Sequence, residues 1–155
     1  MSDENQGTAG AMVSGLGTLV PAETDSAEAT LALGRRLAAH LQAGDVVALH
    51  GDLGAGKTHL AKGIAAGLGV DPAVVTSPTF TIVQEYATDP PLVHLDLYRV
   101  ESVRDLDGLG LDELFGGEAV VLVEWPERAD GRLPAHTLHL RLLHLGADRR
   151  RIERA

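Results

Sequence analysis

The stretch GDLGAGKT, residues Gly51–Thr58, decides the fold of this chain. It matches the pattern G-x-x-x-x-G-K-[S/T], which binds the phosphates of nucleotides in hydrolases and kinases. Its glycines let the backbone turn tightly and point N–H groups at phosphate oxygens. Lys57 supplies a charge for the outer phosphates, and Thr58 offers a hydroxyl to Mg²⁺. The residues predicted to bind the nucleotide here are Gly51, Asp52, Leu53, Gly54, Ala55, Gly56, Lys57 and Thr58.

The sequence on either side of this stretch supports the motif. Residues 46–49 form a short apolar run that is typical of a buried strand, and Leu60, Ile64 and Leu68 follow at helical spacing. A strand, a glycine-rich loop and a helix in this order are what a phosphate-binding loop requires. The chain has two lysines, and one of them, Lys57, stands at the required position.

Composition favours one cytoplasmic domain. The 155 residues, of which 45% are hydrophobic, suffice for one α/β core, predicted over residues 18–155 after a disordered tail at 1–17. The absence of cysteine excludes disulfides and thiolate metal sites. The first residues show neither a basic segment nor a long apolar one, so we expect no signal peptide and no membrane span.

The net charge of −9 disfavours direct binding of nucleic acid. The one basic cluster, residues 149–151, is interpreted as the end of a strand or a solvated tail rather than as a nucleic-acid patch. If the protein acts in a nucleic-acid pathway, we expect a partner to hold the nucleic acid.

The remaining segments predict an α/β fold. Asp25 and Glu28 resemble a capping pair before a helix, residues 80–86 and 92–98 predict a hairpin, and residues 100–114 predict one or two short helices. Residues 120–123 read as a strand covered on both faces, and the alternation in 136–145 suits a late antiparallel strand. Together they predict a P-loop NTPase-like three-layer fold with a mostly parallel sheet, antiparallel hairpin or edge strands and flanking helices.

Two acidic residues compete for the magnesium side of the site. Glu124 directly follows the buried run 120–123, where ligands bind in open α/β sheets. Asp96 shares one strand face with His94 and Tyr98, and that face is either exposed or lines a site. In the loop 77–80, Thr79 is a candidate sensor of the γ-phosphate.

Missing motifs narrow the class of protein. The only asparagine is Asn5, so the chain has no Asn-Lys-x-Asp guanine-binding motif, which argues against a GTPase of the Ras type. No arginine-rich lid segment is evident, which weakens the case for a small nucleotide kinase.

Four motifs in combination resemble the TsaE family, the bacterial ATPases of tRNA threonylcarbamoyladenosine biosynthesis. They are GDLGAGKT at 51–58, SPTF at 77–80, HLDLYR at 94–99 and EWP at 124–126, and the resemblance extends over residues 24–152. It implies a protein that binds ATP and Mg²⁺, hydrolyses ATP slowly when alone, and docks on the TsaD–TsaB pair. That pair modifies adenosine 37 of tRNA, and ATP turnover would reset the pair between cycles. The protein would therefore contact tRNA only indirectly, through these partners.

The resemblance also implies roles for particular residues. The magnesium contacts correspond to Thr58 and Glu124, the essential acidic residue to Asp96, and the loop threonine to Thr79. Trp125 corresponds to the family tryptophan, and Arg150 to an arginine that approaches the adenine. Lys57, Asp96, Glu124 and Thr79 are therefore the predicted catalytic residues, and either Asp96 or Glu124 would orient the attacking water.

Two other functions remain open from the sequence. In a small-molecule kinase on the same fold, the acidic pair would serve an acceptor hydroxyl, and transfer to an acceptor would exceed hydrolysis. In a non-catalytic interaction module, nucleotide binding alone would drive assembly, and hydrolysis-deficient variants would keep their function.

Overall fold

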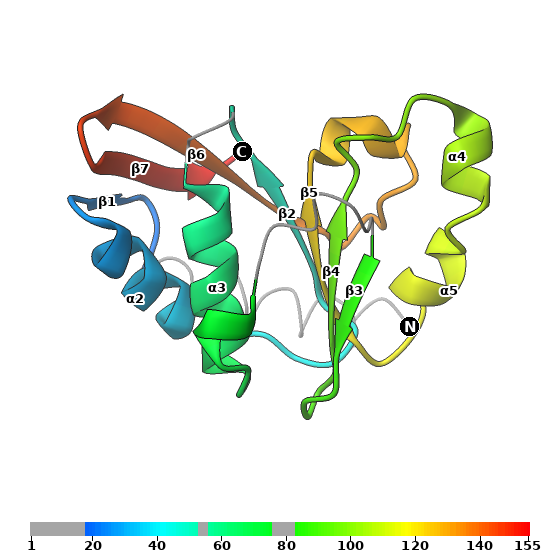
Figure 1. Cartoon of the computed structure of the whole chain (residues 1–155), viewed down its shortest axis with the longest axis horizontal. Helices are drawn as coiled ribbons and strands as arrows, with labels where there is room; N and C mark the ends of the chain where they lie inside the picture. Colours follow the sequence, from blue (N-terminus) through cyan, green and yellow to red (C-terminus); the bar gives the residue numbers. More distant parts are fainter. Residues whose placement is uncertain (1–17, 53–55, 76–82) are drawn as a thin grey trace.

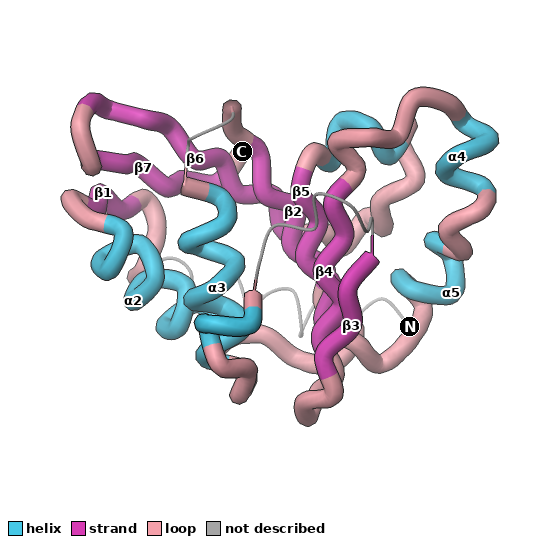
Figure 2. Tube along the Cα trace, viewed as in Figure 1, coloured by secondary structure: helices cyan, strands magenta, loops and turns pink. Residues whose placement is uncertain are grey.

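The computed structural model describes residues 18–52, 56–75 and 83–155 (Figures 1 and 2). They form a seven-stranded sheet in the order β1-β7-β6-β2-β5-β4-β3 with helices on both faces. The central strands β6, β2, β5 and β4 are parallel, and β3, β7 and β1 add antiparallel pairings towards the two edges. The elements are β1 (Ala22–Thr24), α2 (Ala27–Ala38), β2 (Val46–His50), α3 (Lys57–Gly67), η1 (Pro72–Val74), β3 (Val83–Tyr86), β4 (Leu92–Asp96), α4 (Val103–Asp107), α5 (Leu111–Phe115), β5 (Val120–Glu124), η2 (Pro126–Ala129), β6 (Leu138–Gly146) and β7 (Arg149–Arg154).

Strand β2 lies at the centre of the sheet and leads into the glycine-rich stretch. Residues 46–49 of β2 are all buried, because β5 and β6 flank the strand and helices or loops cover both faces. Helix α3 begins directly after Gly56, whose φ of +96° lies in the left-handed region that glycine adopts most readily. The strand predicted before the glycine-rich stretch and the helix predicted after it are therefore confirmed.

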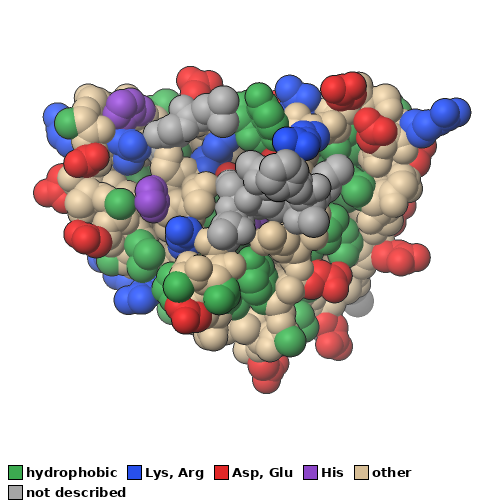
Figure 3. Space-filling model, in the orientation of Figure 1, with side chains coloured by type: hydrophobic (Ala, Val, Ile, Leu, Met, Phe, Trp, Pro, Cys, Tyr) green, Lys and Arg blue, Asp and Glu red, His purple; other side chains and the backbone are tan. Residues whose placement is uncertain are grey.

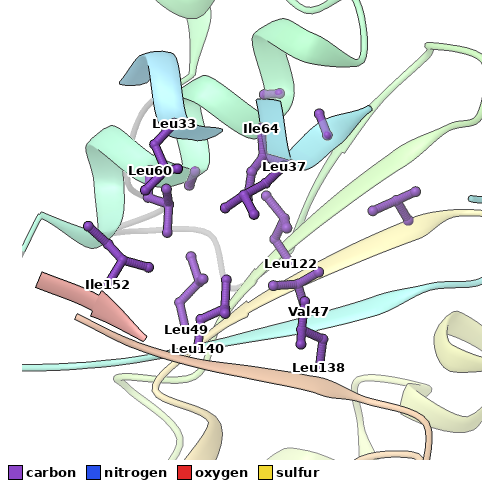
Figure 4. Packing of buried hydrophobic residues seen from close by; sticks show 14 of the residues in the cluster. Leu33, Leu37, Val47, Leu49, Leu60, Ile64, Leu122, Leu138, Leu140 and Ile152 are labelled. Carbon is purple, nitrogen blue, oxygen red and sulfur yellow. The ribbon is translucent and has the colours of Figure 1, made fainter. Parts of the chain in front are cut away.

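Each face of the sheet has its own hydrophobic core. Under α2 and α3, leucines of both helices pack on alternate residues of the central strands, as Figure 4 shows for Leu33, Leu60, Leu49 and Leu122. On the opposite face, Val121 and other residues of β4 and β5 pack against α4, α5 and η2. Burial on both faces explains why residues 120–123 read as a continuous apolar run.

Helices α2 and α3 cross in very close contact at two glycines. A β-carbon at Gly34 would lie 2.8 Å from the Cα of Gly63, and a β-carbon at Gly63 would overlap the Leu31 carbonyl oxygen. Any side chain at either position would push the two helices apart. The contact fixes the spacing between α2 and α3, the helix that carries Lys57 in its first turn.

Some local expectations need correction. The strand predicted over 136–145 is antiparallel to β7 but parallel to β2, because alternation reports one exposed face and not the direction of the partner strand. The cap of α2 is Ser26, whose hydroxyl accepts from Ala29 N at 3.0 Å, rather than the predicted Asp25. The β3–β4 hairpin and the two short helices α4 and α5 are confirmed within the described residues.

The predicted tail, residues 1–17, lies outside the described residues. Among the helices that the structure describes, none is long and apolar enough to cross a membrane.

Candidate phosphate and metal site

The candidate site lies where β2, β5 and β4 end side by side. Gly51 follows β2, Glu124 is the last residue of β5, and Asp96 is the last residue of β4. The pairing register places Glu124 beside Leu49 on one side and beside Asp96 on the other. Ligands bind at this carboxyl edge in open α/β sheets. The strands therefore bring the predicted loop and both predicted acids to one edge.

Both acids point to the face of the sheet that α3 covers. Leu122, two residues before Glu124, and Leu92, four residues before Asp96, both belong to the core under α2 and α3. Because side chains alternate along a strand, Glu124 and Asp96 share that face. Within β4 the face that the sequence left open is buried, because His94 and Asp96 are 1% and 9% exposed, whereas Tyr98, which follows the strand, is 45% exposed.

Lys57 occupies the centre of the site at the start of α3. Its side chain is 6% exposed, its Nζ donates to the Gly51 carbonyl oxygen at 2.6 Å, and the same atom lies 3.9 Å from the centroid of the Trp125 ring. Burial lowers the pKa of Lys57, and the negative charges of Glu124, Glu127 and Asp96 act in the opposite direction. The ammonium group is thus held partly desolvated beside carboxylates, a setting in which an anionic ligand would stabilise its charge.

Trp125 closes the site over Lys57 through an uncommon backbone conformation. Its φ of +56° is rare for a bulky residue, and it turns the chain sharply after Glu124. The indole ring stacks at a tilt on Tyr98, with ring centroids 5.0 Å apart, and offers its face to the Lys57 ammonium group. Arg128 supports Tyr98 from outside: its guanidinium carbon lies 5.5 Å from the Tyr98 ring, and its NH1 donates to the Val100 carbonyl oxygen.

The two acids differ in their partners. Asp96 Oδ1 accepts a hydrogen bond from Tyr98 N at 2.9 Å. Burial raises the pKa of Asp96, the Tyr98 N–H bond opposes that shift, and the charge of Glu124 adds to it. Glu124 is 3% exposed, and its Oε2 lies 2.7 Å from His94 Nε2. Asp96 is thus a carboxyl group whose proton is held more tightly than usual, and Glu124 is a carboxylate fixed by a buried histidine.

Oxygen donors at this edge fit a magnesium ion. Thr58 follows Lys57 in the first turn of α3, and Glu124 faces α3 from β5. Mg²⁺ prefers hydroxyl, carboxylate, water and phosphate oxygens, and it usually takes only one or two protein carboxylates beside the phosphates of a substrate. Among the described residues no group of three or more His, Cys, Asp or Glu side chains is placed to hold a metal. Thr58 and Glu124 are the oxygen donors at this edge that a metal shared with a bound phosphate could use.

Arg150 approaches Gly56 from β7, the strand next to the edge strand β1. A β-carbon at Gly56 would lie 3.3 Å from Arg150 Nε, so this guanidinium group packs on the start of α3. Next to it is a small cavity of about 60 Å³ between α2, α3 and the β6–β7 turn. Its lining residues are Ser26, Ala27, Thr30, Gly56, His59, Asp148 and Arg150. The structure therefore brings Arg150 next to the predicted phosphate loop.

Several predicted site residues cannot be placed. Leu53, Gly54 and Ala55 of the loop, and Thr79 of the SPTF segment, lie outside the described residues, and their assignments stay predictions.

Sequence reasoning did not assign His94, although its spacing placed it on the Asp96 face. The period of two along β4 was the signal that could have found it, because Asp96 and His94 must line the same face. The contact between Lys57 and Trp125 left no such signal, because it depends on the turn after β5.

Comparison with known proteins agrees with this geometry. The family model described as "Threonylcarbamoyl adenosine biosynthesis protein TsaE" matches residues 24–152. The chain belongs to the TsaE family. The matched range includes β2, α3, both acids and Arg150. All of these lie among the described residues. Membership assigns the protein to tRNA threonylcarbamoyladenosine biosynthesis.

Individual relatives are similar over most of their length. TsaE of Bacillus subtilis is 45% identical over 130 residues, covering 83% of this chain and 80% of the relative. TsaE of Streptomyces coelicolor is 47% identical over 114 residues, covering 71% of this chain and 76% of the relative. The crystal structure of Bacillus subtilis YdiB superimposes with a TM-score of 0.70 at 42% identity, covering 84% of this chain and 80% of that one. The predicted fold class is thereby confirmed.

Proposed function

We propose that this TsaE-family protein is a Mg²⁺-dependent ATP hydrolase that resets the TsaD–TsaB complex during threonylcarbamoylation of adenosine 37 in tRNA. The observation that carries the proposal is the position of Lys57, buried at the start of α3 among the charges of Asp96 and Glu124. A cation beside the loop backbone and two carboxylates facing it are the parts that phosphoryl transfer to water requires.

A bound phosphate would replace the Gly51 carbonyl oxygen as the hydrogen-bond acceptor of Lys57. The Nζ atom now donates to the Gly51 carbonyl oxygen, and a phosphate oxygen would take over as acceptor. The start of α3 has no side-chain cap bond, and the N-terminus of a helix favours negative charge, so it would face the same phosphates. Because an anion favours the charged form of lysine, binding would also reverse the lowering of the Lys57 pKa.

Thr58 and Glu124 are the residues that would hold magnesium, either directly or through water. Bound there, Mg²⁺ would neutralise charge on the phosphates. The contribution of the chain is to keep the Glu124 carboxylate oriented and partly dry, which its 3% exposure and its bond to His94 achieve.

Asp96 and Glu124 are the two candidates to orient the attacking water. The raised pKa of Asp96 suits proton acceptance, because the efficiency of a general base rises as its pKa approaches the working pH. The Tyr98 N–H bond fixes the Asp96 carboxylate in direction. We therefore favour Asp96 for the water and Glu124 for the metal.

The adenine end would lie towards Arg150 and the cavity between α2 and the β6–β7 turn. That cavity, about 60 Å³, is small beside the ~300 Å³ of ordinary ligand pockets. Base binding would therefore displace the Arg150 side chain from its packing on Gly56, and would leave the guanidinium group beside the base.

An accessory role fits the charge of the protein. With a net charge of −9, and with acidic side chains visible along the α4–α5 edge in Figure 3, the chain is a poor binder of the tRNA backbone. A partner would hold the tRNA, and the output of ATP turnover would be a change in that partner.

The test is a pull-down of TsaD and TsaB by the purified protein with and without Mg·ATP, paired with measurement of tRNA modification over several turnovers. We expect nucleotide-dependent association and modification that requires the wild-type protein. The Lys57→Ala variant is the matched control and should support neither.

Two outcomes would overturn the proposal. Phosphoryl transfer to an acceptor in preference to water would indicate a kinase. Full support of modification by variants that bind ATP but cannot hydrolyse it would indicate a non-catalytic interaction module.

A further inference from the structure

His94 and Glu124 form a buried hydrogen bond directly behind the candidate metal site. Nε2 of His94 lies 2.7 Å from Oε2 of Glu124, and the two side chains are 1% and 3% exposed. They come from neighbouring parallel strands, two positions apart in register, so the bond runs diagonally across the β4–β5 pair. Such burial gives the two groups few alternative partners.

The second ring nitrogen of His94 identifies which nitrogen carries the proton. Nδ1 is buried and has no hydrogen-bond partner among the described residues. A proton on Nδ1 would bury a donor without an acceptor, and it would leave the Nε2 lone pair facing a carboxylate oxygen. A proton on Nε2 avoids both costs and donates to Glu124. Nδ1 is then an unprotonated nitrogen, which is the cheaper group to leave without a partner.

We propose that His94 is a positioning residue that donates its Nε2 proton to Oε2 of Glu124 and so presents Oε1 to the magnesium ion. The inference rests on the proposed function and adds a residue to it. Groups that hydrogen-bond a metal ligand fix its orientation, and their loss typically costs about 10-fold to 100-fold in metal affinity or activity.

The bond to His94 also engages a carboxylate that acts electrostatically on Lys57. The Glu124 carboxylate is the strongest of the acidic influences on Lys57. Without the bond to His94, Glu124 would gain most by turning towards the Lys57 ammonium group. Such an ion pair would occupy both the cation needed for phosphate and the carboxylate needed for the metal.

Two conservative variants separate this role from simple core filling. In His94→Gln, the amide nitrogen stands near the position of Nε2 and can still donate to Glu124. In His94→Asn, the shorter amide places its donor near the position of Nδ1, away from Glu124. Both variants put a neutral amide at the same buried site, so each is the matched control of the other. Thermal unfolding of both variants reports whether the fold is kept.

The first measurement is the gain in nucleotide affinity that Mg²⁺ produces, followed through Trp125 fluorescence during ADP titration with and without Mg²⁺. We expect His94→Asn to reduce this gain by about 10-fold or more and His94→Gln to keep most of it, with magnesium-free affinity the same in all three proteins. An equal gain in both variants and the wild type would overturn the inference.

The second measurement does not depend on ATP chemistry. Nitrogen-15 NMR of the histidine rings should show a protonated Nε2 and an unprotonated Nδ1 for His94 in the nucleotide-free protein. A ring with a proton on Nδ1 and none on Nε2 would overturn the inference even if hydrolysis is normal. The opposite outcome is also informative. If the wild-type protein fails to hydrolyse ATP, but His94 shows the expected NMR signature and the Gln and Asn variants differ as expected, the proposed function is contradicted. The role of His94 then remains.

Discussion

The phosphate side and the acidic side of the site are built in different ways. The phosphate side is one continuous segment, from the end of β2 through the loop to the first turn of α3, where Gly51 accepts from Lys57. The acidic side is assembled from β4 and β5. Between the end of β4 at Asp96 and the start of β5 at Val120 lie 23 residues, yet the two strands pair directly in the sheet. Trp125 joins the two sides, because it follows Glu124 and its ring covers Lys57.

This difference predicts a division of labour. The local segment can bind phosphates wherever it folds, because its charge and its N–H groups come from neighbouring residues. The acidic side exists only when the sheet is complete, and under the proposed function it would supply what hydrolysis adds to binding. Variants of the first side should therefore affect binding and turnover together, whereas variants of the second should affect turnover selectively.

The largest effect is expected from Lys57→Ala. Removal of the ammonium group eliminates the only lysine in the site and leaves the charges of Glu124 and Asp96 facing the phosphates. We expect ATP affinity to fall by at least about 10-fold and turnover by about 1,000-fold, as for other preorganised cationic groups at phosphoryl-transfer sites. Isothermal titration and a phosphate-release assay measure the two quantities. Unchanged affinity would contradict the assignment of the phosphate side.

The next effect is expected from Asp96→Asn, which keeps the acceptor for Tyr98 N but removes the charge. Turnover should fall by about 100-fold or more, the usual contribution of a positioned general base. ATP affinity should stay within a few-fold of the wild type, since Lys57 and the loop are intact. A parallel loss of affinity and turnover would mean that the two sides are not separate.

A smaller effect is expected from Trp125→Leu, which keeps apolar volume but removes the aromatic face above Lys57. The lost interaction between cation and ring is worth about 1 kcal/mol, which corresponds to roughly 5-fold in affinity for phosphate. Trp125→Phe retains a ring and is the control. If Leu and Phe behave alike, the ring contact does not link the two sides.

The smallest effect is on stability and depends on pH. The pKa of Asp96 is raised in the folded protein, so the folded state holds this proton more tightly than the unfolded state. That contribution to stability is complete below the unfolded-state pKa and is lost as pH rises through the raised pKa. Asp96→Asn should therefore be more stable than the wild type at neutral pH, by up to about 1 kcal/mol.

Denaturant unfolding at several pH values checks this prediction. The difference in unfolding free energy between Asp96→Asn and the wild type should be smallest in acid and should grow as pH rises. A difference that shrinks with rising pH would have the wrong sign for a carboxyl group destabilised by burial.

The same contrast explains what the sequence could predict. The phosphate side was readable because glycines, lysine and threonine stand at fixed spacing within one segment, and the flanking apolar patterns confirmed a strand and a helix. Glu124 was identifiable as the residue at the end of a strand, whereas Asp96 was predicted inside a strand over 92–98 that in the structure ends at Asp96. Their adjacency was not identifiable, because pairing of β4 with β5 is decided by the packing of the whole sheet.

Other features depended on tertiary structure alone. The bond from His94 to Glu124 requires the register of two strands, and the approach of Arg150 to Gly56 requires the β6–β7 turn to lie beside the first turns of α2 and α3. The antiparallel pairing of β6 with β7 agrees with the prediction, but its parallel pairing with β2 was not predicted, since one strand carries no information about the direction of its neighbour. The close contact of Gly34 with Gly63 likewise has no signature in either helix taken singly.

The most direct test of the central claim is phosphate release from ATP by the wild-type protein in the presence of TsaD and TsaB, measured across a range of Mg²⁺ concentrations. We expect release that requires Mg²⁺. It should be lost in Asp96→Asn, although this variant should still bind ATP. Release that is independent of Mg²⁺, or that Asp96→Asn retains in full, would contradict the claim that the paired ends of β4 and β5 supply the hydrolytic side of the site.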